Sequence, residues 1–181
     1  MKMDLKRFKK EQGLTLIEAL IWFAIFAAVV VGVFSLYASA RTVNFAAKTN
    51  KEITYMFASI QEKYANDSTA DLYNKVAYQF GIFPSTLKVA VASNGYIGDV
   101  THSFGGRVVI YGYAPNGFDV SYYDIPSGEA CLRIVREQKK TGWTMLNNTP
   151  YERFTIQKMD EICNNPAEKG NVFALSFRYL D

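Results

Sequence analysis

The pattern of apolar and polar positions divides the chain into a long apolar segment near its start and a mixed segment after it. From Leu14 to Ala40 the only strongly polar side chain is Glu18, and the residues 19–34 are uninterrupted apolar sequence. A membrane-spanning helix needs about 20 mostly apolar residues. Residues 14–36 are therefore long enough to cross a membrane.

Apolar positions recur with helical spacing after this segment. They are Ile53, Met56, Phe57, Ile60 and Tyr64. Charged and amide side chains occupy the other faces of the same stretch, as an amphipathic helix requires. The two stretches together predict one helix of roughly 50 residues that ends near residue 65, where Asn66 to Thr69 interrupt the pattern.

The remaining pattern predicts an α+β head with a spine helix packed on an antiparallel sheet. We expect a second helical stretch at 69–80 and then a Gly- and Ser-rich loop to Gly106. β-branched and aromatic residues predict a hairpin of strands 107–113 and 118–123, joined at Asn116-Gly117. After it we expect a helix to about 138, an irregular surface at 139–153, a helix at 155–163 and a final strand at 172–179.

The charge of the chain is concentrated before the apolar segment. Residues 1–13 carry five of the 20 basic residues and two of the 17 acidic residues, so 15 of each remain in 14–181. This basic start should stay in the cytoplasm and the rest should lie outside it. Because the remainder is formally neutral and has no basic run with interleaved aromatics, we expect no direct nucleic-acid binding.

Two cysteines, Cys131 and Cys163, lie in the head. In an oxidising compartment they most simply form one disulfide, and two separate buried thiols are the alternative. The one histidine, His102, is far from both in sequence. We therefore expect no metal site and no cofactor, and we expect His102 to be a surface residue.

The segment Gly13-Leu14-Thr15-Leu16-Ile17-Glu18 joins the basic start to the apolar helix. A carboxylate at the edge of a membrane-length helix is costly and marks a functional site by default. With its basic leader, glycine, hydrophobic next residue and glutamate five residues in, this arrangement resembles the type IV pilins. The alternative is a plain single-span anchor with a chance glutamate.

The resemblance implies cleavage between Gly13 and Leu14 by a prepilin peptidase, which also N-methylates Leu14. In the family, Glu18 is thought to pair with the new N-terminus of a neighbouring subunit and set the assembly register. The implied domains are a leader 1–13, a transmembrane and filament-core helix 14–40, and a pilin head 41–181. The head divides into a spine helix 41–65, an αβ-loop 66–105, and a sheet and disulfide region 106–181.

The head resembles the type IVb major pilins of thin pili. The features are Leu14 as first mature residue, the 131–163 cysteine spacing, and the block 104–109 followed by 116–118 and 125–126. This resemblance implies a structural subunit of a fimbrium used for adhesion, cell aggregation or conjugative contact, and no enzymatic activity. The alternative is a minor pilin or a type II secretion pseudopilin in a short periplasmic filament.

The implied partners are those of a filament. They are other copies of the chain in a helical homo-oligomer, the prepilin peptidase, an inner-membrane assembly platform, an assembly ATPase, an outer-membrane secretin and minor pilins. Before assembly the chain would sit in the inner membrane with its head in the periplasm, and afterwards in an extracellular pilus.

Four tyrosines crowd the predicted hairpin, at positions 111, 113, 122 and 123. For any one of them a place in the sheet core is the more ordinary reading. A contact between subunits or between pili is the alternative, because aromatic residues are enriched in interfaces.

Overall fold

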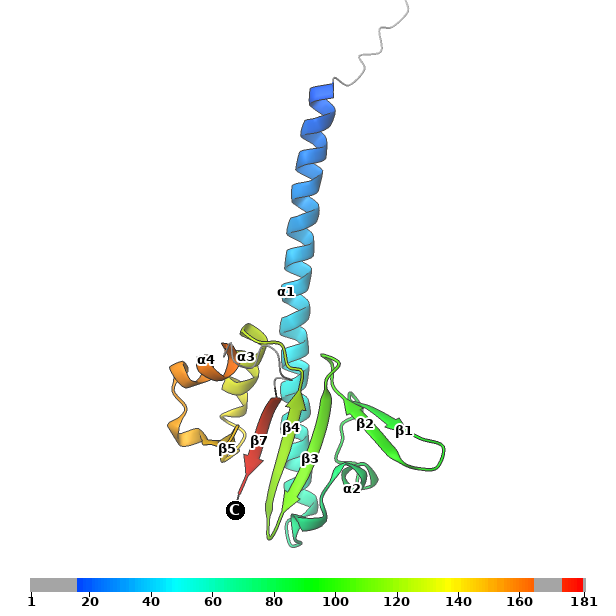
Figure 1. Cartoon of the computed structure of the whole chain (residues 1–181), viewed down its shortest axis with the longest axis vertical. Helices are drawn as coiled ribbons and strands as arrows, with labels where there is room; N and C mark the ends of the chain where they lie inside the picture. The colour runs from blue at the N-terminus through cyan, green and yellow to red at the C-terminus, as the bar shows by residue number, and fades with distance from the viewer. Residues whose placement is uncertain (1–15, 165–173, 181) are drawn as a thin grey trace, which may run out of the picture. The chain divides into compact units, whose positions relative to one another are not determined.

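The computed structural model describes residues 16–164 and 174–180 (Figure 1). Its contacts divide the chain into two compact units, Met1–Ala40 and Arg41–Asp181. Helix α1, Leu16–Lys63, contributes its first residues to unit 1 and its last residues to unit 2. The single long helix expected from the apolar pattern is therefore confirmed for the described residues.

After α1, unit 2 contains short helices and strands. In chain order they are the 3-10 helix η1 (Thr69–Asp71), α2 (Asn74–Gln79), β1 (Lys88–Val91), β2 (Ile97–Thr101), β3 (Arg107–Tyr113), β4 (Gly117–Tyr123), α3 (Glu129–Gln138), β5 (Met145–Leu146), β6 (Thr149–Pro150), η2 (Tyr151–Arg153), α4 (Ile156–Asn164) and β7 (Ala174–Tyr179).

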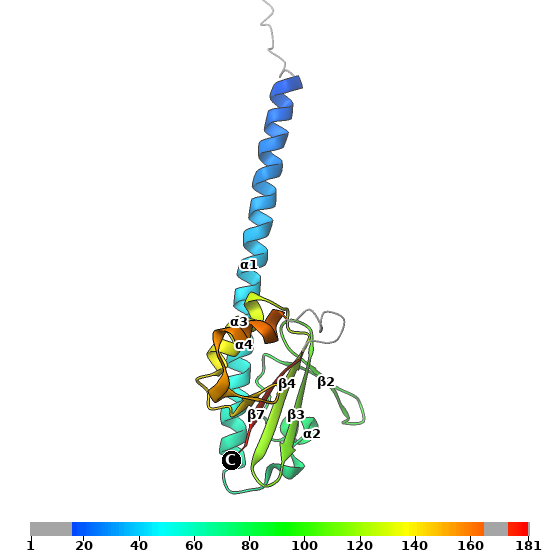
Figure 2. The same cartoon turned by 60° about the vertical axis from the view of Figure 1, so that its left-hand side comes forward.

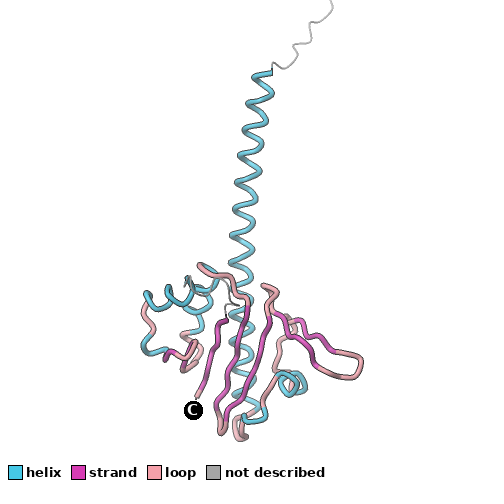
Figure 3. The backbone as a smooth tube through the Cα atoms, viewed as in Figure 1, coloured by secondary structure: helices cyan, strands magenta, loops and turns pink. Residues whose placement is uncertain are grey.

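The strands form one antiparallel sheet in the order β1-β2-β3-β4-β7-β5-β6 (Figure 3). The long strands β3, β4 and β7 are its centre, and β7 enters beside β4 although α3 and α4 separate the two in sequence. The expected α+β class is confirmed: a long N-terminal apolar helix, an antiparallel sheet and one disulfide.

The core of unit 2 lies between α1 and the sheet. Ile53, Met56 and Ile60, at helical spacing, are fully buried. Next to them the Phe57 ring meets the Trp143 ring at a centroid distance of 4.7 Å and the Phe118 ring at 5.7 Å. Burying one such side chain stabilises the folded state by about 1.5–3 kcal/mol, so the packing of this helix face contributes much of the stability of the head.

Helices α3 and α4 lie at the β7 side of the sheet, and the β1–β2 hairpin and α2 lie at the other side (Figures 1 and 2). The disulfide between Cys131 and Cys163 joins α3 to α4. This places the disulfide between the two helices where the sequence predicted it.

The sequence predictions for the loops and the turn of the head are wrong at three places. The expected loop up to Gly106 contains β1 and β2, whose connection turns at Gly95 with a φ of 76°. The expected irregular surface at 139–153 contains β5, β6 and η2, and it buries Trp143, Leu146 and Tyr151. Gly117 is not a turn residue, because it pairs with Tyr113 as the first residue of β4.

The helical stretch expected at 69–80 is two short helices, η1 and α2, separated at Leu72 and Tyr73. The extended residue Tyr73 pairs with Tyr111 beside β3, and the Leu72 carbonyl accepts from the Gly112 N–H at 2.8 Å. Pairing with the sheet therefore overrides the local helical pattern at this point.

Candidate functional site: the apolar helix and its head

The residues of α1 up to position 40 present apolar side chains on every face. Leu16, Trp22, Phe23, Phe34 and Leu36 are each more than three-fifths exposed. Soluble proteins rarely leave so large a continuous apolar surface in water. By length and composition, α1 is a helix that could cross a membrane.

Glu18 lies in the first turn of α1 and is exposed. A carboxylate in this position interacts favourably with the positive end of the helix dipole. Gly13 and Leu14, the predicted cleavage residues, lie outside the described residues. Their predicted role, and that of Glu18 in pairing, stays a prediction.

The disulfide lies in the interior of the head. Both sulfur-bearing residues are at most 1% exposed, and their Cα atoms are 5.6 Å apart. The Gly128 N–H also donates to the Cys163 carbonyl at 3.1 Å, so the start of α3 is fixed to α4 twice. The bond therefore ties α3 to α4 inside the head.

The buried side-chain amide of Gln138, the last residue of α3, joins α3 to α1. The Gln138 Nε2 group donates to Asn50 and Thr54 of α1 at 3.1–3.2 Å. The Gln138 Oε1 atom accepts from the Thr141 hydroxyl and the Trp143 indole N–H, each at 3.0 Å. Because both ends of the amide are satisfied, the network fixes where α3 ends on α1.

The face of the sheet opposite α1 carries a second polar network, which the alternating sequence pattern did not reveal. Asp119 on β4 is only 4% exposed. This is unexpected, because side chains alternate along a strand and its two neighbours, Phe118 and Val120, are the residues that point into the core. It accepts from the hydroxyls of Ser121 (2.8 Å) and Ser176 (2.6 Å) and from the Arg178 guanidinium (3.3 Å). The guanidinium of Arg178 also lies 5.1 Å from the Tyr113 ring centroid.

The four hairpin tyrosines have different environments. Tyr122 is fully buried, as expected if it belongs to the core of the sheet. Tyr111 is 61% exposed and Tyr113 is 38% exposed, and Tyr123 lies beneath the Arg107 guanidinium at 4.9 Å. Exposed tyrosines therefore remain only on the outer face of the hairpin.

The prediction that His102 is a surface residue is wrong, because it is 5% exposed. Its Nδ1 accepts from the Phe104 N–H at 3.2 Å, which leaves Nε2 to donate to the Tyr123 carbonyl at 2.7 Å. Burial lowers the pKa of His102, against the opposing effects of that carbonyl and of Asp124. A Cβ at Gly106 would collide with the Tyr123 carbonyl, so this glycine makes room for the buried ring.

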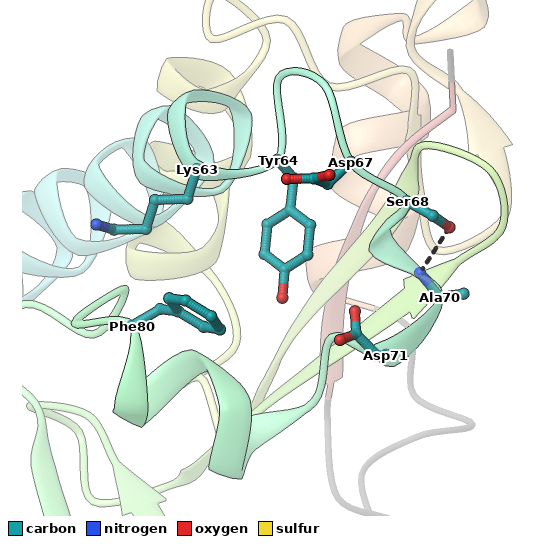
Figure 4. Close-up of a pocket in the computed structure, with 7 residues that line it drawn as sticks. All are labelled: Lys63, Tyr64, Asp67, Ser68, Ala70, Asp71 and Phe80. Carbon is teal, nitrogen blue, oxygen red and sulfur yellow. Dashed lines mark hydrogen bonds between the residues drawn. The ribbon is translucent and has the colours of Figure 1, made fainter.

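A pocket of about 490 Å³ lies at the end of α1 (Figure 4). The Tyr64 side chain points between Phe80 and Asp71, and Asp67 lies beside it, whereas Lys63 points away. Burial, Asp71 and Asp67 together raise the pKa of Tyr64. The pocket thus combines two aromatic side chains with an acidic rim.

Within residues 16–164 and 174–180, no group of three or more His, Cys, Asp or Glu side chains could hold a metal ion. His102 uses both ring nitrogens in hydrogen bonds, and the two cysteines use their sulfurs in the disulfide. None of these three side chains is therefore free to bind a metal ion in the conformation described.

No profile of a known protein family and no curated protein sequence matches the chain. Among solved structures it is similar to the type IVb pilin of Salmonella typhi, with a TM-score of 0.52 and 19% sequence identity. The match covers 74% of this chain and 97% of that pilin. The chain therefore has the type IV pilin fold. The resemblance to type IV pilins is confirmed at the level of the fold.

Proposed function

We propose that the chain is a type IVb pilin subunit that polymerises through the apolar part of α1. The proposal rests on the combination of the pilin fold with a long helix whose large apolar side chains are exposed. Other copies of the same helix would cover it in a filament. Adhesion, cell aggregation and conjugative contact are the uses that such a filament would serve.

The transfer from membrane to filament core moves apolar side chains from one apolar environment to another. Lipid tails are as apolar as leucine, so this transfer supplies little hydrophobic driving force. Close packing and polar pairs must then decide the register. In this account, cleavage after Gly13 creates an ammonium on Leu14, and the Glu18 carboxylate of a neighbouring subunit neutralises it.

A charge pair of this kind is sensitive to the loss of one partner. Removing one member of a buried ion pair costs about 3–5 kcal/mol, because the other charge remains buried without compensation. We therefore expect Glu18→Val to abolish filaments while membrane insertion and cleavage after Gly13 continue. Electron microscopy of sheared cell surfaces and immunoblots of membrane fractions would measure the two effects.

Glu62→Val is the matched control, since Glu62 is an exposed glutamate of the same helix within the head. Cells that carry this variant should make normal filaments. Normal filaments from Glu18→Val cells would contradict the pairing role. Processed wild-type protein that stays in the inner membrane would favour the minor pilin or pseudopilin alternative over the major subunit.

A further inference from the structure

A group of polar side chains is buried inside the head where α1 faces β4. Thr49 and Glu52 lie three residues apart on α1, and therefore on one face of the helix. Tyr122 lies on β4. Their exposed fractions are 0%, 1% and 0%. A glutamate is almost never buried to this extent without a paired charge.

The polar atoms of this group are poorly satisfied. The Thr49 hydroxyl, both Glu52 carboxyl oxygens and the Tyr122 hydroxyl are buried and make no hydrogen bond of normal geometry within the described residues. The Thr86 hydroxyl is near enough to favour the charged form of Glu52 without completing such a bond. Ionising a carboxyl in these surroundings is costly, because Thr86 and Lys48 replace only part of the stabilisation that its water of hydration would give.

The charged and titratable groups around Glu52 come from each element packed against it. From α1, Lys48 favours the ionised carboxyl, and from the segment before β1, Thr86 does the same. From β4, Tyr122 faces Glu52, and the ring of His102 contacts Tyr122 at a centroid distance of 5.2 Å, with Asp124 near His102.

The effect of burial exceeds the effects of these neighbours. Desolvation raises the pKa of Glu52 above its ordinary value of 4.5, against the opposing effects of Thr86 and Lys48. Burial, with a contribution from the charge of Glu52, raises the pKa of Tyr122 well above its ordinary value. The neutral form of each group is thus the one that fits the interior.

We propose that Glu52 is a proton-controlled latch: its neutral carboxyl lets α1 lie against β4, and its ionisation releases this part of the helix from the sheet. The latch is a property of the head, and it holds whether or not the chain polymerises. It goes beyond the proposed pilin function, because it makes the docking of the spine helix depend on pH.

The direction follows from the raised pKa. When the helix is released, Glu52 is solvated and titrates near 4.5; when the helix is docked, it titrates higher. The stability from the latch is complete below pH 4.5 and is lost as the pH rises through the docked-state pKa. Between the two pKa values the equilibrium constant for opening should rise about tenfold per pH unit.

His102 works in the opposite direction. Its lowered pKa means that its contribution is complete above pH 6.5 and is lost as the pH falls through the lower folded-state value. A measurement on the wild-type protein alone would therefore combine the two groups. The difference between the wild-type chain and Glu52→Gln isolates the contribution of Glu52.

The test is hydrogen exchange with mass spectrometry on the full chain in detergent, from pH 4.5 to mildly alkaline pH, corrected for the intrinsic exchange rate. Peptides that cover 46–60 and 117–123 should lose protection as the pH rises in the wild-type chain. They should keep their protection in Glu52→Gln, which retains shape without a titratable group. Glu62→Gln, at an exposed position of the same helix, should behave like the wild-type chain.

Three results would overturn the latch. They are constant protection in the wild-type chain, the same pH-dependent loss in Glu52→Gln, and a loss spread evenly over the whole head. If Glu52→Gln does not fold, carbon-13 NMR of the glutamate carboxyls in the wild-type chain decides. One carboxyl titrating in step with the opening of 46–60 supports the latch, and all carboxyls titrating near 4.5 overturns it.

Discussion

At the scale of residues, Asp119 shows how a single carboxylate organises the outer face of the sheet. It collects three donors from two strands: Ser121 beside it on β4, and Ser176 and Arg178 on β7. A hydrogen bond to a charged group contributes about 1.5–3 kcal/mol, and the contributions of bonds within one network do not simply add. Among the residues on the face of the sheet opposite α1, Asp119 should therefore be one of those whose substitution destabilises the head most.

Asp119→Ala should lower the free energy of unfolding by about 2–3 kcal/mol, because Arg178 is left partly buried without its carboxylate. Urea denaturation of the full chain in detergent, followed by circular dichroism, would measure the loss. Asp99→Ala changes an exposed aspartate of β2 and is the control. An equal loss in both variants would mean that the network does not stabilise the fold.

Gly112 is a second sensitive residue, for a steric reason. A Cβ at this position would collide with the Thr69 carbonyl and come within 2.9 Å of the Leu72 Cβ. Gly112→Ala should therefore push η1 away from β3 and cost about 1–3 kcal/mol, the usual range for overpacking. Thermal unfolding of the full chain would detect the change.

Gly98→Ala is the matched control within the sheet, because its Cβ would make an ordinary contact of 3.4 Å with Ala90. It should change stability by about 1 kcal/mol or less in either direction. If Gly112→Ala is as mild as Gly98→Ala, the close approach of η1 to β3 is not a constraint on the fold.

At the scale of elements, the disulfide and the Gln138 network hold α3 and α4 in place beside the sheet. Cys131 and Cys163 are 32 residues apart in sequence. In the chain-entropy description, a cross-link over a loop of this length stabilises by about 3–4 kcal/mol. The buried position of both residues adds packing to this effect.

The double variant Cys131→Ser, Cys163→Ser should therefore have a free energy of unfolding about 3–4 kcal/mol lower than that of the wild-type chain. Non-reducing urea denaturation would compare the two proteins. Adding a reductant should lower the stability of the wild-type chain and leave the double variant unchanged. A reductant effect of equal size in both would show that the bond is not its source.

The elements also show what could be predicted from the sequence. The long helix, strands β3, β4 and β7 and helices α3 and α4 were predictable, because their apolar positions repeat with a helical or strand period. The disulfide was predictable because the head contains two cysteines and was expected in an oxidising compartment. Hairpin β1–β2 was missed despite the Asn94-Gly95 pair, since β1 has only four residues and is mostly exposed. Strands β5 and β6 have two residues each, too few for any period to be visible.

The buried polar groups were missed for another reason. His102 lies in a Gly- and Ser-rich segment, and nothing local indicates that the Tyr122 and Phe104 rings enclose it. Glu52 falls among the helix positions that the sequence pattern assigned to the polar face, yet it is 1% exposed. Such positions are set by contacts between distant segments, which a pattern along one segment does not contain.

At the scale of the whole molecule, the chain combines two units whose surfaces suit different surroundings. The residues of α1 up to Ala40 expose apolar side chains, and unit 2 has a closed core with its own disulfide. An exposed apolar surface of this size marks a site of contact with a membrane or with other protein chains. The proposed pilin function supplies both, one before assembly and the other after it.

The most direct test of this account is mass spectrometry of the protein sheared from cell surfaces, with intact mass and N-terminal peptides measured with and without reduction. We expect an abundant filament protein that begins at N-methylated Leu14 and carries a Cys131–Cys163 bond. A chain that still carries Gly13 in cells with an active prepilin peptidase would contradict it, and would leave a plain membrane anchor as the better description of the helix.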